Sequence, residues 1–178
     1  TDPAPAAYRF VNASPQLGRG MVFIETFGGF VPADKQIVAL DQTTGDVVWF
    51  DNDGGQGQGT PVYLDAADGG RLYTSGQNSL RCRRASDGTR LWDSAVDTPT
   101  TWTTAPWVIF ASVTHHEGKI YSVGADSAFA ATTATLVCAD AGTGDLDWQV
   151  DAPVSDVPPL VLDGKVYIYG GGFPGRMA

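Results

Sequence analysis

The sequence is poor in the residues that carry catalytic and metal-binding chemistry. Its 178 residues include two cysteines and two histidines. No apolar run approaches the roughly 20 residues that a transmembrane helix needs, so we expect no membrane span. No glycine-rich loop is followed by the lysine and helix typical of phosphate sites, and no nucleophile-triad motif is present. These absences argue against most hydrolytic and nucleotide-dependent enzymes.

Positive charge is also scarce. The chain has 11 lysines and arginines against 20 aspartates and glutamates, which gives a net charge of −9. Such a surface repels nucleic acid and anionic membranes, and we expect neither as a partner. Most of the acidic residues are aspartates, which start turns, so the excess favours many short strands. Adaptation to high salt is an alternative source of the same excess.

What the sequence does contain is an eleven-residue pattern that occurs three times. It runs from a small residue through an acidic turn, Thr-Gly in its full form, to a tryptophan. The second copy is looser, because arginine and aspartate replace the usual aspartate and threonine. The three copies are Ala39, Asp41, Thr44, Gly45 and Trp49; Cys82, Arg84, Asp87, Gly88 and Trp92; and Cys138, Asp140, Thr143, Gly144 and Trp148.

A second pattern, glycine followed by any residue, an aliphatic and an aromatic, occurs four times. It lies at 20–23, 70–73, 118–121 and 164–167. Successive copies are separated by 50, 48 and 46 residues (70−20, 118−70 and 164−118). A period in this range indicates a propeller or a solenoid.

Together the two patterns resemble the blade repeat of pyrroloquinoline-quinone-type β-propellers, including their tryptophan-docking motif. The resemblance covers about residues 8–169 and implies an all-β fold of four-stranded antiparallel blades. We expect three complete repeats plus partial blades at both ends. The predicted divisions are a linker at 1–7 and propeller repeats over 8–178, with blades at about 14–50, 60–93, 105–149 and 158–178.

The predicted first strands of the later blades follow a proline, at 61–64, 106–110 and 159–162. Each docking tryptophan should lie across its own hairpin and into the gap between blades, over the small residue of its repeat; an exposed aromatic platform is the alternative. Cys82 and Cys138 occupy this same slot in successive blades. Such positions are about 10 Å apart, while a disulfide needs Cα atoms within about 7 Å. We therefore expect two free, slowly reacting thiols.

Partial blades leave sheet edges and blade faces open. We expect them to be covered by the rest of a longer polypeptide, by a symmetric partner that completes an eight-bladed ring, or by pairing of residues 8–11 with the C-terminal strands. The start at Thr1 favours a processed mature protein or a piece of something longer. The isolated chain is not expected to be a stable lone monomer unless its ends pair.

Candidate metal ligands are few. Asp51 and Asp53 lie in an acidic loop, but the spacing and the distal glutamate of a calcium loop are missing. His115 and His116 are adjacent, and neighbours on a strand point to opposite faces, so we favour a solvated turn over a metal site there. We expect no metal and no catalytic residue.

Two insertions lengthen the blades, at 97–105 and 126–135. Functional contacts on a propeller tend to lie in such loops, so Trp102 and Phe129 are candidate contact residues, with local packing over a blade edge as the alternative. A small basic patch should pair with nearby aspartates; it consists of Arg81, Arg83 and Arg84.

The resemblance implies either a scaffold or an enzyme. Quinone-dependent dehydrogenases of this fold use a vicinal cysteine pair, a stacking tryptophan and metal-binding carboxylates, and none of these can be placed on this chain. We expect a non-catalytic, extracytoplasmic scaffold (periplasmic, secreted or cell-surface) for protein–protein interaction or assembly, similar to periplasmic propellers that help assemble outer-membrane proteins. Its partner would be another protein, further blades or a homo-oligomer.

The first alternative is a section of a quinone-dependent dehydrogenase whose cofactor site lies outside this chain. Pyrroloquinoline quinone and calcium belong only to that alternative. The second is a module that binds glycans or surfaces through its aromatic loops.

Overall fold

The computed structural model describes residues 14–25, 37–51, 59–76, 79–95, 108–110, 112–126, 133–153, 155 and 157–170. Every regular element in these ranges is a β-strand, which confirms the predicted all-β class. Within them, no helix has the length and hydropathy to cross a membrane.

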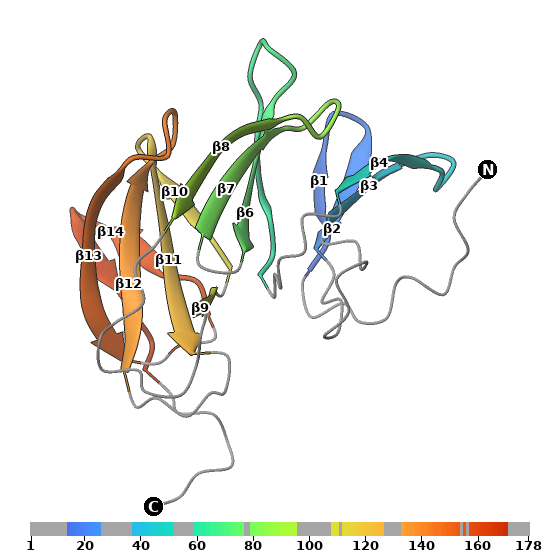
Figure 1. Ribbon diagram of the computed structural model, residues 1–178. Helices are drawn as coiled ribbons and strands as arrows, with labels where there is room; N and C mark the ends of the chain where they lie inside the picture. The colour runs from blue at the N-terminus through green and yellow to red at the C-terminus, as the bar shows by residue number, and fades with distance from the viewer. Residues whose placement is uncertain are drawn as a thin grey trace, which may run out of the picture.

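The strands form three successive antiparallel sheets, set side by side as the blades of a propeller sector (Figure 1). The first blade runs β1-β2-β3-β4 and the second β5-β6-β7-β8. Their strands are β1 (Gln16–Gly18), β2 (Met21–Glu25), β3 (Ile37–Asp41) and β4 (Val47–Asp51), then β5 (Val62–Leu64), β6 (Arg71–Gly76), β7 (Ser79–Arg84) and β8 (Arg90–Ala95).

The third blade runs β10-β11-β12-β13, and β9 pairs with the far end of β11. A two-stranded sheet, β14-β15, forms a partial fourth blade. The strands are β9 (Val108–Phe110), β10 (Thr114–His116), β11 (Lys119–Asp126), β12 (Thr133–Asp140), β13 (Leu146–Pro153), β14 (Leu160–Leu162) and β15 (Lys165–Tyr167).

The prediction for the first strand of the third blade was wrong. Residues 106–110 do not fill that position; β10 does, because His115 pairs with Ile120 just as Tyr63 pairs with Leu72 in the second blade. The apolar run is stronger as a strand signal, but the hairpin turn just before β11 decides which strand lies beside it. His115 and His116 consequently lie on a strand and not in the predicted solvated turn.

Three of the hairpins use the same two-residue turn. The pairs Arg19-Gly20, Glu117-Gly118 and Asp163-Gly164 have positive φ at both positions, from 46° to 77°. Positive φ at both central residues is the type I′ geometry that matches the twist of a hairpin. The glycine that starts each Gly-x-aliphatic-aromatic copy in these blades is the second residue of the turn, and its positive φ is the reason that glycine is required there.

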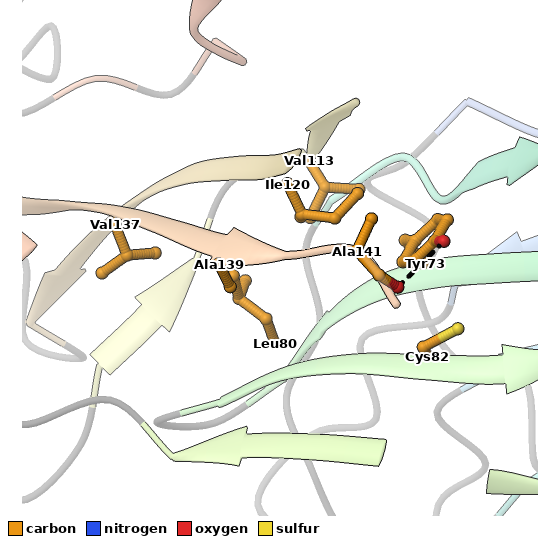
Figure 2. Packing of buried hydrophobic residues seen from close by; sticks show 8 residues of the cluster. All are labelled: Tyr73, Leu80, Cys82, Val113, Ile120, Val137, Ala139 and Ala141. Carbon is orange, nitrogen blue, oxygen red and sulfur yellow. Dashed lines mark hydrogen bonds between the residues drawn. The ribbon is translucent and has the colours of Figure 1, made fainter. Parts of the chain in front are cut away.

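The hydrophobic core lies between the blades. In the second strand of each blade, the aromatic residue of the repeat faces the next blade, and the residue before it faces the previous one. Phe23 packs toward Leu72, and Tyr73 packs toward Ile120. The cluster between the second and third blades is the largest (Figure 2); it consists of Tyr73, Leu80, Cys82, Val113, Ile120, Val137, Ala139 and Ala141.

Candidate interaction surface

The docking tryptophans join successive blades. Trp49, on β4, lies on the turn between β7 and β8 of the second blade. Its indole Nε1 donates a hydrogen bond to the Ala85 carbonyl oxygen at 2.9 Å. A Cβ atom added to Gly88 would lie 2.7 Å from the Trp49 ring, so only glycine fits below it. Trp49 is 9% exposed.

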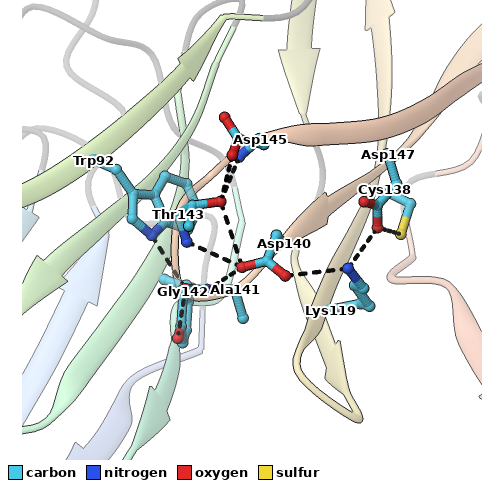
Figure 3. A network of polar contacts seen from close by, with 10 residues as sticks. Trp92, Lys119, Cys138, Asp140, Ala141, Gly142, Thr143, Asp145 and Asp147 are labelled. Atoms are coloured by element: carbon cyan, nitrogen blue, oxygen red, sulfur yellow. Dashed lines mark hydrogen bonds and ion pairs between the residues drawn. The ribbon is translucent and has the colours of Figure 1, made fainter.

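Trp92 makes the same contact with the third blade. Its Nε1 donates to the Ala141 carbonyl oxygen at 3.1 Å (Figure 3), and a Cβ on Gly144 would lie 2.6 Å from its ring. The hydroxyl of Tyr73 donates to the same carbonyl. The glycine of each motif thus supports the tryptophan of the previous blade. Sequence reasoning missed this role, although the constant spacing between the glycine and the tryptophan of each copy was a signal that could have revealed it.

An aspartate closes the turn of the first blade. Oδ1 of Asp41 accepts hydrogen bonds from the backbone N–H groups of Thr43 and Thr44, each at 2.8 Å. These bonds, the one from Thr44 first, hold the pKa of Asp41 below its usual value. The Asp41 side chain therefore closes the turn onto the backbone, as the motif predicted.

In the third blade the turn aspartate joins a charged network (Figure 3). Lys119 Nζ lies 2.9 Å from an Asp147 oxygen and 3.1 Å from an Asp140 oxygen. The hydrogen bonds that Lys119 donates to Asp147 and to Asp140 raise the pKa of Lys119, and Lys119 in turn lowers the pKa of Asp140. Cys138 Sγ lies 3.6 Å from Asp147, and burial raises the pKa of the Cys138 thiol. Lys119 stays protonated, and the thiol is a poor nucleophile.

Trp148 differs from the other two docking tryptophans. Its ring centroid lies 6.1 Å from that of Tyr121 in its own blade, but the side chain is 37% exposed. Among the described residues, no carbonyl accepts a hydrogen bond from its indole N–H, and no turn glycine lies under its ring. Val150, two residues along β13, is 49% exposed. Trp148 and Val150 form what we call the outer C-terminal face.

This face is open among the described residues because the fourth blade is partial there. In the described part of the chain, β15 pairs only with β14. Trp49 and Trp92 are each covered by the turn between the third and fourth strands of the following blade. No such strands follow β15 in the described residues. Within the described residues, one edge of β15 is therefore unpaired and the adjacent tryptophan has no such cover.

Asp51, one of the weak calcium candidates in the sequence, takes part in a contact between blades. It forms an ion pair with Arg83 of the second blade, whose Nε lies 2.7 Å from Asp51 Oδ2. Arg83 has no exposed surface, so this pair links the first two blades inside the interface. Arg81 pairs with Asp93 and Arg84 with Asp87, which confirms the pairing predicted for the three arginines. Two of them, however, are buried.

The two histidines point apart. The His115 ring stacks on Tyr73 of the second blade, with centroids 6.2 Å apart and an interplanar angle of 14°, and burial lowers the pKa of His115. His116 lies 3.7 Å from Glu117. The described residues contain no group of three histidine, cysteine or acidic side chains placed to hold a metal. Asp53, Trp102 and Phe129 lie outside the described residues.

Solved structures with the same fold include BamB and quinohemoprotein alcohol dehydrogenases. BamB from Moraxella catarrhalis aligns with a TM-score of 0.61 at 17% identity, over 89% of this chain and 46% of its own. The quinohemoprotein alcohol dehydrogenase ADHIIG from Pseudomonas putida HK5 gives 0.58 at 17% identity, over 88% and 23%. That from Comamonas testosteroni gives 0.53 at 17%, over 84% and 22%. This chain spans less than half the length of each, and the likeness establishes a β-propeller fold.

No curated protein matches the sequence significantly. A family model does: the one described as outer membrane protein assembly factor BamB matches residues 6–108, which is more than half of the chain. The matched segment contains the first two docking motifs and the contact of Trp49 with Ala85. The chain therefore belongs to the BamB-type family of pyrroloquinoline-quinone-like repeat proteins.

Proposed function

We propose that this chain is a non-catalytic, extracytoplasmic scaffold that binds another protein through its outer C-terminal face, in the assembly of outer-membrane proteins. The observation that carries the proposal is Trp148, a docking tryptophan that is fixed against Tyr121 and yet 37% exposed. A large aromatic side chain held in place on an open surface is a typical anchor of protein interfaces. The family description supports the assembly role.

The shape of the open region supports a β-hairpin as the binding partner. The edge of β15 that is unpaired in the described residues can accept an added strand through backbone hydrogen bonds. Trp148 beside it requires a small residue under its ring and a carbonyl for its indole N–H, as Gly88 and Ala85 provide for Trp49. A β-hairpin with a glycine turn satisfies both requirements, and outer-membrane barrel proteins consist of antiparallel strands joined by turns.

The polar groups nearby support binding over catalysis. Lys119 is held between two carboxylates, and the Cys138 thiol is buried with a raised pKa. Neither is poised as a base or a nucleophile at neutral pH.

Binding of an unfolded barrel protein tests the proposal. A fluorescently labelled outer-membrane β-barrel protein, diluted from urea, is titrated with the chain and followed by anisotropy. We expect Trp148→Ala to weaken binding at least about tenfold, as for an interface anchor. Val157→Ala, which truncates another exposed apolar residue, serves as the matched control and should bind as the wild type does. Equal affinity of Trp148→Ala and wild type would refute the proposal.

The dehydrogenase alternative has a test of its own. Pyrroloquinoline quinone and calcium are added together, and the quinone absorbance is followed. We expect no saturable spectral change. Saturable binding would favour a section of a quinone-dependent enzyme.

A further inference from the structure

We propose that Asp163 is a site of spontaneous backbone isomerisation, at which the bond to Gly164 is slowly converted into an isoaspartyl linkage. The described residues contain three Asp-Gly pairs, at 68–69, 87–88 and 163–164. Aspartate before glycine is prone to this reaction because glycine has no Cβ atom to hinder ring closure at its backbone nitrogen. The three pairs differ in how the structure restrains their reacting groups. The reaction is independent of the binding role proposed above.

The reaction uses only solvent water and conserves all atoms. The backbone nitrogen of Gly164 attacks Cγ of the protonated Asp163 carboxyl group; a C–N bond forms, and the hydroxyl group leaves with the amide proton as water. The product is a cyclic imide. Water then adds to either carbonyl carbon of the imide: addition at Cγ restores aspartate, whereas addition at the original backbone carbonyl leaves the chain running through Cγ. The isoaspartyl chain has one more backbone carbon and an unchanged mass.

The pair at 87–88 is restrained at both reacting groups. The Asp87 carboxylate accepts hydrogen bonds from the Thr89 backbone N–H at 2.9 Å and from the Arg84 guanidinium at 3.1 Å. These bonds, the one from Thr89 first, lower the pKa of Asp87, so less of the protonated form is present. The N–H of Gly88 donates to the Arg84 carbonyl oxygen at 2.9 Å. Both groups must leave these partners before the ring closes.

The pair at 68–69 is restrained in the same way. Oδ2 of Asp68 lies 2.9 Å from Nη2 of Arg71, and the N–H of Gly69 donates to the Ala66 carbonyl oxygen at 3.3 Å. Gly69 is also buried, and a Cβ atom on it would lie 2.5 Å from the Ser86 hydroxyl oxygen. The backbone at this pair therefore has little room to rotate.

The pair at 163–164 has neither restraint. Both residues are exposed, and they form the two-residue turn between β14 and β15, where pairing ends at Leu162 and Lys165. In the part of the chain that the structure describes, no hydrogen bond or ion pair involves the Asp163 carboxylate, and no carbonyl accepts from the Gly164 N–H. Rotation toward ring closure therefore breaks no such bond of either reacting group.

The same turn carries other residues in two further blades. Arg19 and Glu117 hold the position of Asp163, each followed by glycine and each with positive φ. Arginine has no carboxyl group, and glutamate can close only to a larger ring, which forms more slowly. Of these three turns, the one at Asp163 is therefore the one that combines an exposed hairpin with the reactive side chain.

An isoaspartyl residue at 163 lengthens the turn by one backbone carbon. In a hairpin the turn fixes the register of its strands, which here pairs Leu162 with Lys165. Val166 and Ile168 follow the turn and pack against the core cluster of the third blade. We therefore expect the modified chain to hold β15 less firmly and to be cut there faster by a protease.

Ageing of the folded chain tests the proposal. The protein is incubated at about pH 5, where more of each carboxyl group is protonated than at neutral pH, and is then digested. The isoaspartyl peptide keeps its mass but changes its retention time, and electron-transfer fragmentation locates the linkage. We expect the isomer to accumulate at Asp163 at least about tenfold faster than at Asp68 or Asp87, because a hydrogen bond to a charged group is worth at least that factor.

Two controls separate the fold from the dipeptide itself. Asp163→Glu keeps the charge, and Glu117 shows that the turn accepts glutamate; this variant should lose the modified peptide, with circular dichroism as the check that it is folded. In urea, all three pairs of the wild type should react at similar rates, because their restraints are gone. Equal rates at the three pairs in the folded chain, or a reaction at Asp163 that occurs only in urea, would overturn the proposal.

Discussion

At the residue scale, the three docking tryptophans have the same sequence context but different surroundings. Trp49 is buried against the β7–β8 turn of the next blade, whereas Trp148 is 37% exposed. We expect Trp49→Ala to lower the free energy of unfolding by about 3–5 kcal/mol. Trp148→Ala loses mainly an aromatic pair with Tyr121 and should cost less than about 1.5 kcal/mol. Urea denaturation measures both, and equal losses would contradict the assigned environments.

His115 makes the stability depend on pH. Burial, and to a lesser degree the charge of His116, lowers the pKa of His115 in the folded chain. Below about pH 6.5 the unfolded chain binds this proton more readily, so the free energy of unfolding should fall as the pH drops from there. His115→Gln should flatten the dependence, and His116→Gln should retain most of it. Thermal melting of the three proteins between about pH 7.5 and pH 5 tests this prediction. Carboxylates whose pKa is lowered, such as Asp41, titrate below that range and do not interfere.

At the scale of the element, two turn glycines allow the cost of backbone strain to be measured apart from the cost of packing. Gly45 and Gly88 have nearly the same φ, 77° and 75°, so alanine at either should cost about 1–2 kcal/mol in strain. Of these two glycines, Gly88 lies under a tryptophan and Gly45 does not. Gly88→Ala should therefore lose about 1–3 kcal/mol more than Gly45→Ala, the typical cost of overpacking. Equilibrium unfolding followed by tryptophan fluorescence compares them, and identical losses would mean that Trp49 does not dock there.

Between elements, the ion pair of Arg83 and Asp51 should hold the first two blades together. Arg83 is fully buried, so Arg83→Ala leaves a partly buried carboxylate without this partner and should cost about 3–5 kcal/mol. Arg84→Ala breaks the exposed pair with Asp87 and should cost less than about 1 kcal/mol. Calorimetric melting of the two variants tests the contrast. Similar melting temperatures would show that the buried pair adds no more stability than the exposed one.

At the scale of the whole molecule, both thiols report on opening of the blades. Cys82 is 0% and Cys138 2% exposed, and both are free. Burial raises the pKa of Cys82 to about 11, and the thiolate is the reactive form. Alkylation in native buffer should be slow at both sites and faster at Cys138, which lies beside the open face.

Mass spectrometry after alkylation under denaturing, non-reducing conditions should find two labelled cysteines. Two observations would count against this arrangement: labelling of the native protein at the rate of an unfolded peptide, or a bridge between Cys82 and Cys138. The second would mean that the register of the repeats is wrong.

The sequence alone determined the fold class, the repeat and its turns. These depend on local rules: glycine allows the positive φ at Gly20, Gly118 and Gly164, and alternation of apolar residues marks the strands. The same rules misplaced the first strand of the third blade, because the apolar run at 106–110 and the short strand β10 compete for one position. Pairing with β11, which is a tertiary contact, settles that competition.

Only the tertiary structure decided which docking tryptophan is free. Trp49 and Trp148 stand in the same motif, and their difference arises from the blade that follows each of them. It also placed Arg83 against Asp51 and His115 against Tyr73, because contacts between blades join residues tens of positions apart. The sequence pattern repeats from blade to blade, but the surroundings of each blade do not, and burial and binding depend on those surroundings.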